Sequence, residues 1–180
     1  MNTPSAWSER ARTFADPWTA AGWSEASQKA RFAAVLAATK PQPGERLLDV
    51  GCGTGAFCEW LPASVAYTGF DTAPGMIHRA AKDHPGRVFQ SWQPTQTFDV
   101  TVVIGPFNLP DGWSKEATWH TLRHLWDRTT RVLAVSLYAG DDEQCLRYTE
   151  ADCAGLLGES YRSSVTRWRS NDLLVVLERS

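Results

Sequence analysis

The stretch "RLLDVGCGTGAF", Arg46 to Phe57, joins a short apolar segment to a loop with three glycines at alternate positions. Glycine has no Cβ, so its backbone turns tightly and lets a ligand approach closely. The apolar segment is short enough for a buried strand, and we expect the loop to lead from this strand into the start of a helix, at the carboxyl edge of a sheet, where open α/β folds bind ligands. The stretch therefore predicts a nucleotide-like ligand at this edge.

The chain has the size and composition of a single globular domain. Its 180 residues, 43% hydrophobic and 21% charged, suffice for one packed core and argue against wholesale disorder. A formal charge of -2 creates no field that would attract nucleic acid or an anionic membrane. The first residues lack the apolar core of a secretory signal, and no apolar run approaches the ~20 residues that span a bilayer. We expect one domain over residues 1–180, in the cytoplasm, without membrane or nucleic-acid partners; the sequence carries no signal for its oligomeric state.

Short apolar runs after the first helix predict the strands of a parallel sheet. Runs such as "DVTVVI" and "VLAVSL" are apolar throughout, which is typical of strands buried on both faces. Segments with helical spacing lie between most of the runs, and this alternation predicts βαβ units. The runs are Arg46 to Val50, Ser64 to Phe70, Arg87 to Gln90, Phe98 to Ile104 and Arg131 to Tyr138.

Capping residues and turn signals complete the expected fold. Ser24 to Thr39 and Ser114 to Asp127 each begin with a serine cap, and Thr149 to Gly158 begins with a T-x-x-D capping box. After Tyr161, two strand-like runs about a polar "RSND" predict a closing hairpin. We expect a doubly wound, mostly parallel seven-stranded α/β sheet with helices on both faces and a C-terminal antiparallel hairpin. Its parts are a helical segment (1–40), a ligand-binding core (45–138) and a C-terminal helix and hairpin (139–180).

Two nucleotide-binding patterns compete for the glycine loop. A phosphate loop is excluded, because no Lys-Ser/Thr pair follows the glycines to contact a β- or γ-phosphate. A dinucleotide fingerprint fits better: Gly51, Gly53 and Ala56 match G-x-G-x-x-A, and Asp71 follows at the distance of a ribose-binding acid. A nicotinamide-dependent oxidoreductase therefore stays open as an alternative.

Asp49, two residues before the first glycine, favours a different ligand. A carboxylate at the tip of the strand would repel a pyrophosphate and attract a cation. S-adenosylmethionine carries an ammonium, a sulfonium and a free ribose diol, so Asp49 near its methionine end and Asp71 at its diol would suit it. The two acids together predict this cofactor.

Three segments in order, "LLDVGCGTG", "YTGFDTAPGMIHRA" and "FDVTVVIG", resemble the class I, seven-stranded Rossmann-like methyltransferases that use S-adenosylmethionine. The resemblance covers roughly Arg46 to Tyr138. It implies that the glycine loop lines the methionine moiety and that Asp71 holds the ribose. The cofactor-binding residues that it implies are Asp49, Gly51, Cys52, Gly53, Gly55, Asp71, Thr72, Met76 or Ile77 near the adenine, and Ile104 and Gly105 facing the methyl group.

The sequence departs from this family in two places. After the third strand, where many relatives have an acid for the adenine amino group, "VFQSWQPTQ" offers Trp92 to stack on the base and Gln93 to accept from it. After the fourth strand, "GPFNLP" differs from the (D/N)-P-P-(Y/F) signature of enzymes that methylate exocyclic amines of DNA bases. This difference weighs against a DNA methyltransferase.

The acceptor pocket is expected over the carboxyl edge of the fourth strand. Phe107, Asn108 and Trp113 follow that strand, and Trp23 in the N-terminal segment is a candidate lid residue, although tryptophans there also suit simple packing. With little sequence beyond the core, a small-molecule acceptor is favoured over a protein or RNA. A non-catalytic module with a methyltransferase-like fold is the remaining alternative.

Methyl transfer needs positioning more than acid-base chemistry, so no catalytic triad is expected. Weak candidates for a general base are His120, His124 and Tyr138, and an exposed helix surface is the favoured interpretation of the two histidines. "HTLRH" has no acid between the histidines and no obvious third ligand, so no metal site is predicted. Cys52 is interpreted as a small residue that fits the loop rather than as a nucleophile.

Overall fold

The computed structural model describes residues 3–110, 113–154 and 162–179. Seven strands form one sheet in the order β3-β2-β1-β4-β5-β7-β6. The strands β1 to β5 pair with one another in parallel, and β7 is antiparallel to both β5 and β6. The predicted fold, a mostly parallel seven-stranded sheet with a C-terminal antiparallel hairpin, is confirmed. The strands are β1 (Arg46–Val50), β2 (Ala66–Phe70), β3 (Val88–Gln90), β4 (Phe98–Ile104), β5 (Thr129–Tyr138), β6 (Arg162–Arg169) and β7 (Asp172–Glu178).

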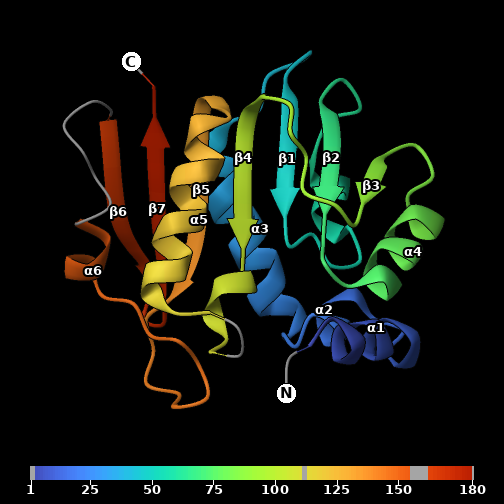
Figure 1. Cartoon of the computed structure of the whole chain (residues 1–180), viewed down its shortest axis with the longest axis horizontal. Helices are drawn as coiled ribbons and strands as arrows, with labels where there is room; N and C mark the ends of the chain where they lie inside the picture. Colours follow the sequence, from blue (N-terminus) through green and yellow to red (C-terminus); the bar gives the residue numbers. More distant parts are fainter. Residues whose placement is uncertain (1–2, 111–112, 155–161, 180) are drawn as a thin grey trace.

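Helices cover the sheet on both faces (Figure 1). Alternate residues of β1 belong to different buried clusters, because successive side chains of a strand point to opposite faces. Leu48 clusters with Leu122 of α5, whereas Leu47 clusters with Phe32 and Val35 of α3. The helices are α1 (Pro4–Thr13), α2 (Pro17–Ala20), α3 (Glu25–Thr39), α4 (Pro74–Asp83), α5 (Lys115–Asp127) and α6 (Glu150–Ala154), with 3-10 turns η1 (Ala56–Trp60) and η2 (Pro106–Asn108).

Side-chain caps begin the predicted helices where the sequence places them. Ser24 Oγ accepts a hydrogen bond from the Ser27 amide at the start of α3, and Ser114 Oγ caps α5 in the same way. Thr149 and Asp152 form the reciprocal capping box: each accepts from the other's amide, at 3.2 and 2.8 Å. The end of this helix, predicted at Gly158, lies outside the described residues.

Two local features differ from the sequence-based expectation. The glycine loop leads into the 3-10 turn η1 rather than into a helix, because Pro62 follows closely and Phe57 and Cys58 pack into the core. Helices α1 and α2 also precede the predicted helix of the N-terminal segment. Both begin with a proline at the first helical position, and Thr3 Oγ1 caps α1, a signal that could have located it.

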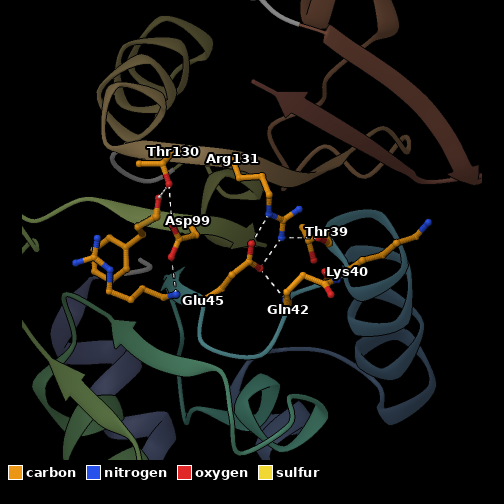
Figure 2. Close-up of polar contacts among 9 residues, drawn as sticks. Thr39, Lys40, Gln42, Glu45, Asp99, Thr130 and Arg131 are labelled. Carbon is orange, nitrogen blue, oxygen red and sulfur yellow. Dashed lines mark hydrogen bonds and ion pairs between the residues drawn. The ribbon is translucent and has the colours of Figure 1, made fainter. Parts of the chain in front are cut away.

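Polar contacts tie β1, β4 and β5 together at the amino edge of the sheet, far from the glycine loop (Figure 2). The Arg131 guanidinium donates to the Glu45 carboxylate at 2.7 Å. Asp99 accepts from the Arg46 amide and the Thr130 hydroxyl, both at 2.8 Å, and the amide hydrogen bond is the main cause that lowers the pKa of Asp99 below its usual value. This network fixes the strand starts and leaves the opposite, carboxyl edge for a ligand.

None of the helices in the described ranges is both long and apolar enough to cross a bilayer.

Candidate cofactor and acceptor site

The glycine loop combines two closely packed glycines with one that faces open space. Gly51, Gly53 and Gly55 all have positive φ angles, of 74°, 53° and 80°. A Cβ on Gly51 would lie 2.7 Å from the Pro106 side chain, and one on Gly55 would lie 2.7 Å from Phe89. Nothing lies within 4 Å of a Cβ placed on Gly53. The outer two glycines therefore fix the loop against its neighbours, and the space beside the middle one is free for a ligand.

Asp71, directly after β2, is held by backbone amides of two segments. Its Oδ2 accepts from the Gly53 amide and its Oδ1 from the Ala73 amide, each at 2.9 Å. Burial raises the pKa of this carboxyl although both hydrogen bonds lower it. Each oxygen keeps a second lone pair, so a fixed Asp71 carboxylate can still accept hydrogen bonds from a diol.

Asp49 is a buried acid at the carboxyl end of the inner strand β1. Its side chain is 2% exposed, and the Tyr67 hydroxyl donates to its Oδ2 at 2.7 Å. Desolvation raises the pKa of Asp49 to about 7, against the lowering effect of the Tyr67 hydrogen bond. Burial removes the water that stabilises the ionised form of this carboxyl. A cation beside it would stabilise that form instead.

A cavity of about 40 Å³ lies between the glycine loop and α3. Trp23 covers Gly105, and a Cβ at Gly105 would clash with the indole ring. Pockets for drug-sized ligands have volumes of roughly 300–1,000 Å³, so the closed cavity is too small for a nucleoside. The residues lining it include Trp23, Phe32, Asp49, Cys52, Phe57 and Ile104.

Cys52 contributes its backbone to this loop, and its thiol stays protonated. Desolvation, followed by the Asp49 and Asp71 charges, raises the pKa of the Cys52 thiol well above its usual value. A protonated thiol is a poor nucleophile, so this environment supports the interpretation of Cys52 as a small residue that fits.

The N-terminal helices pack on α4 beside the glycine loop. Ser8 Oγ accepts from the Gly75 amide at 3.0 Å, and a Cβ on Gly75 would lie 2.7 Å from the Ser8 backbone. Met76 is 2% exposed in a small core with Ala11 and Ala20. The predicted adenine neighbour Met76 is therefore covered by α1 and α2, while Thr72 beside Asp71 is exposed.

The residues predicted for the acceptor pocket lie together after β4, but Asn108 has a structural contact. Its Oδ1 accepts from the Tyr138 amide at 2.9 Å, which joins the ends of β4 and β5. Phe107 is 1% exposed and meets Trp113 edge to face, with ring centroids 4.5 Å apart. The Tyr138 hydroxyl accepts from the Asp142 amide at 3.1 Å.

Other predicted residues lie away from the cavity. His120 and His124 are exposed on α5, and their Nε2 atoms are 2.9 Å apart. Gln93 lines a separate groove of about 260 Å³ together with His124 and Arg128. Trp92 is 69% exposed, so no protein group covers the ring that was predicted to stack on adenine. Across the described ranges, no group of three or more His, Cys, Asp or Glu side chains could hold a metal ion.

Sequence reasoning missed Tyr67 as the partner of Asp49. The strand pairing explains the contact: Asp49 lies opposite Gly69 in the parallel ladder, and Tyr67 is the next residue of β2 on the same face. The side chain of Tyr67 can reach Asp49 over Gly69. The sequence signal that could have indicated this contact is a tyrosine two residues before a glycine, Gly69, on the strand that pairs with Asp49.

The chain belongs to a family of methyltransferases. A family model described as a methyltransferase domain matches residues 23–130, which include the glycine loop, Asp49 and Asp71. No curated protein matches the chain in sequence.

Solved structures of methyltransferases have the same fold. The magnesium protoporphyrin IX methyltransferase of Synechocystis PCC 6803 with bound SAM superposes with a TM-score of 0.69 at 21% identity, covering 86% of this chain and 80% of that one. The N-methyltransferase NodS of Bradyrhizobium japonicum WM9 with S-adenosyl-L-homocysteine gives 0.72 at 17% identity, covering 96% of each chain. The PH0226 protein of Pyrococcus horikoshii OT3 gives 0.70 at 13% identity, covering 96% of this chain and 99% of that one. The fold is that of the class I methyltransferases, whose cofactor is S-adenosylmethionine, as the sequence predicted.

Asp49 predicts a pH-dependent stability. Its pKa is about 7 in the folded chain and near 3.8 when unfolded, so the folded state holds the extra proton between these values. The contribution of Asp49 to the free energy of unfolding is therefore greatest below about pH 4 and is lost as the pH rises through 7. One pKa unit corresponds to about 1.4 kcal/mol, so the loss is about 4 kcal/mol when the carboxyl is fully ionised. We expect Asp49→Asn to remove this loss and to be the more stable protein at pH 8.

Urea unfolding of both proteins at pH 5 and pH 8 measures the effect. Asp127→Asn, at an exposed acid that ends α5, is the control and should follow the wild type at both pH values. A stability difference between Asp49→Asn and wild type that is the same at pH 5 and pH 8 would contradict the raised pKa.

Proposed function

We propose that this protein transfers the methyl group of S-adenosylmethionine to a small-molecule acceptor. The observation that carries the proposal is the pair of acids on either side of the open face of Gly53. Asp49 is buried with one hydroxyl donor, and Asp71 is fixed by the Gly53 and Ala73 amides with lone pairs to spare. A ligand with a cationic end and a ribose diol satisfies both acids.

The residues present fit this cofactor along its length. Asp49 would hold the ammonium, and Asp71 would accept from the two ribose hydroxyls. The space beside Gly53 admits the ligand without meeting a side chain. Ile104 and Gly105, at the end of β4, would lie by the methyl group. We place the adenine beside Thr72, Met76 and Trp92, and this assignment rests on the resemblance; Gln93 is left out because its side chain lines the separate groove.

Binding requires Trp23 to move. The cavity of about 40 Å³ is roughly a tenth of what a nucleoside ligand needs, and Trp23 forms the wall nearest Gly105. The described residues that precede α3, 3–23, would thus act as a lid on the carboxyl edge, whereas α3 stays packed in the core: the lid would open for the cofactor and exclude water when it closes again.

The protein's part in the reaction is positioning and exclusion of water. S-adenosylmethionine, when bound, supplies a methyl group on a sulfonium, and the acceptor atom's lone pair bonds to that carbon while the S–C bonding pair stays on sulfur. Gly105 would leave room for the acceptor to approach in line, and Phe107 and Trp113 would form the pocket wall behind it. His120, His124 and Tyr138 remain candidates for removing an acceptor proton; of these, only Tyr138 ends a strand at the site's edge of the sheet.

The buried Asp49 also argues against the other functions considered. A dinucleotide would bring its pyrophosphate to the loop beside Asp49, and two like charges in a desolvated site repel strongly. A non-catalytic binding module would use the same cofactor site, and turnover separates it from an enzyme. A cytoplasmic location and the absence of nucleic-acid partners stay predictions from the sequence.

Asp71→Ala tests the cofactor assignment. We expect calorimetry to show that the wild type binds S-adenosylmethionine and S-adenosylhomocysteine but not NAD. Loss of the Asp71 acceptors should weaken binding of both adenosyl ligands at least tenfold, because a charged hydrogen-bond acceptor contributes about 1.5–3 kcal/mol. Asp127→Ala, at the exposed end of α5, should bind as the wild type does. Binding of NAD alone, or full affinity in Asp71→Ala, would refute the assignment.

Trp23→Ala tests the lid. Without the indole over Gly105, the site should open more readily, so both the association and the dissociation rate of S-adenosylhomocysteine should rise severalfold. Stopped-flow fluorescence measures both rates, and Trp119→Phe on α5 serves as a control for the loss of one fluorophore. Unchanged rates in a Trp23→Ala protein with an unchanged melting temperature would show that Trp23 only packs against the core.

A further inference from the structure

Three buried polar atoms have no hydrogen-bond partner within the described part of the chain. They are Arg31 Nε, Ser136 Oγ and Trp168 Nε1. Buried polar groups of folded proteins are nearly always paired, so each such atom calls for an explanation. Arg31 is 7% exposed and Ser136 is 1% exposed, which leaves bulk water no access to them. All three can donate a hydrogen bond, and Nε of arginine and Nε1 of tryptophan can do nothing else.

The three atoms belong to one face and one end of the sheet. Ser136 pairs with Ile104 of β4 on one side and with Leu174 of β7 on the other. The face is the one covered by α3, because Leu174 and Trp168 pack in the cluster that contains α3 residues. Arg31 of α3 reaches this end of β7 through its ion pair with Asp172 at 2.7 Å.

Strand β6 brings the third donor to the same place. Trp168 lies where the β6–β7 register shifts between Arg167 and Arg169, next to the pairing partner of Asp172. Val165 of β6 packs on the opposite cluster, so the alternation of side chains along the strand places the Trp168 indole on the face that α3 covers, where it packs against the buried cluster. Three elements, α3, β5 and β6, therefore each contribute one unpaired donor at the carboxyl edge.

The buried charge around these donors is balanced, and the one further cation beside them in the described residues, the Arg169 guanidinium 5.6 Å from the centre of the Trp168 ring, is exposed and screened by solvent. Arg31 and Asp172 form a buried ion pair with side-chain exposures of 8% and 2%, and Arg31 Nη1 also contacts the Ser27 hydroxyl. A ligand carboxylate beside Arg31 would be repelled by the Asp172 carboxylate. A ligand cation would be repelled by Arg31 and would find only hydrogen-bond donors around it. Uncompensated buried charge is costly in either case. A neutral oxygen acceptor matches the donors without disturbing the ion pair.

Trp23 separates these donors from the cofactor cavity. The Arg31 guanidinium lies 5.0 Å from the centre of the Trp23 ring, and the same ring covers Gly105. Ile104 lines the cavity and is also the β4 neighbour of Ser136. None of the three donors lines the cavity, so Trp23 would have to move aside before the cavity could extend along Ile104 to the donors. The aromatic rings of Phe32 and Trp168, which belong to one buried cluster, would then form its walls.

Resting on the proposed methyltransferase function, we propose that the methyl acceptor is a neutral, flat molecule with a carbonyl or hydroxyl oxygen, and that Arg31, Ser136 and Trp168 bind this oxygen. The flat part of the acceptor packs between the rings of Phe32 and Trp168. The three donors bind the neutral acceptor in preference to charged analogues. These residues determine specificity and leave the methyl transfer itself to the groups at Gly105.

Three simple probes of one shape distinguish the acceptor class: benzamide, benzoate and benzylamine, which are neutral, anionic and cationic. The probes are titrated into ¹⁵N-labelled protein with and without saturating S-adenosylhomocysteine, and the indole N–H signals are followed by NMR. Trp168→Phe assigns the Trp168 signal. We expect benzamide to shift this signal and to bind at least tenfold more tightly than benzoate and benzylamine.

Ser136→Ala and Ser163→Ala form a matched pair, because Ser163 is an exposed residue of β6 on the outer part of the sheet. Ser136→Ala should weaken benzamide binding at least fivefold, and Ser163→Ala should leave it unchanged. Tighter binding of benzoate or benzylamine, or no shift of the Trp168 signal with any probe, would overturn the proposal and leave the donors to bridging water.

The same samples separate the two levels of the argument. Binding of S-adenosylhomocysteine without a benzamide response at Trp168 refutes only the acceptor class. Absence of S-adenosylhomocysteine binding refutes the proposed function, and the titrations without this ligand then still decide whether the donor cluster binds a neutral oxygen.

Discussion

The site depends on one buried carboxylate at the end of the inner strand β1. Asp49 lies inside a seven-stranded sheet, with β2 on one side and β4 on the other, and among the described residues only the Tyr67 hydroxyl donates to it. An isolated carboxylate in such a place is unfavourable, and its raised pKa of about 7 is the measure of that cost. A strand position that serves packing alone would carry an apolar residue, as its neighbours Leu48 and Val50 do. The acid is therefore best understood as half of a pair whose other half is a ligand.

The strand order places this acid where a ligand can reach it. The connections from β1 run outward to β2 and β3 on one side, while β4 and β5 follow on the other, so the crevice between β1 and β4 lies at the point where the order reverses. Gly51 and Pro106 close the floor of that crevice by direct contact, and the space beside Gly53 remains above it. Trp23 then covers the end of β4. The fold thus builds a candidate site with an acid at its base and an aromatic residue as its roof.

Most of the fold was predictable from the sequence because apolar runs and caps are local signals. All five parallel strands, the terminal hairpin and the caps at Ser24 and Ser114 lie where the residues indicate. The residues of the candidate site could be predicted only where they belong to a local sequence motif, as Gly53 and Asp71 do. The contacts of Asp49 with Tyr67 and of Trp23 with Gly105 are long-range, and no local pattern encodes them. Gln93 shows the same limit: proximity in sequence to the third strand did not bring its side chain to the cavity.

Proton release on cofactor binding tests the role of Asp49 most directly. At pH 6 a carboxyl with a pKa of about 7 is mostly protonated, and an ammonium placed beside it would drive the proton off. Calorimetry of S-adenosylmethionine binding in buffers of different ionisation enthalpy counts these protons. The account predicts release of about one proton per cofactor at pH 6 in the wild type and none at pH 6 in Asp49→Asn. A binding enthalpy that is independent of the buffer in the wild type, or equal proton release in Asp49→Asn, would contradict it.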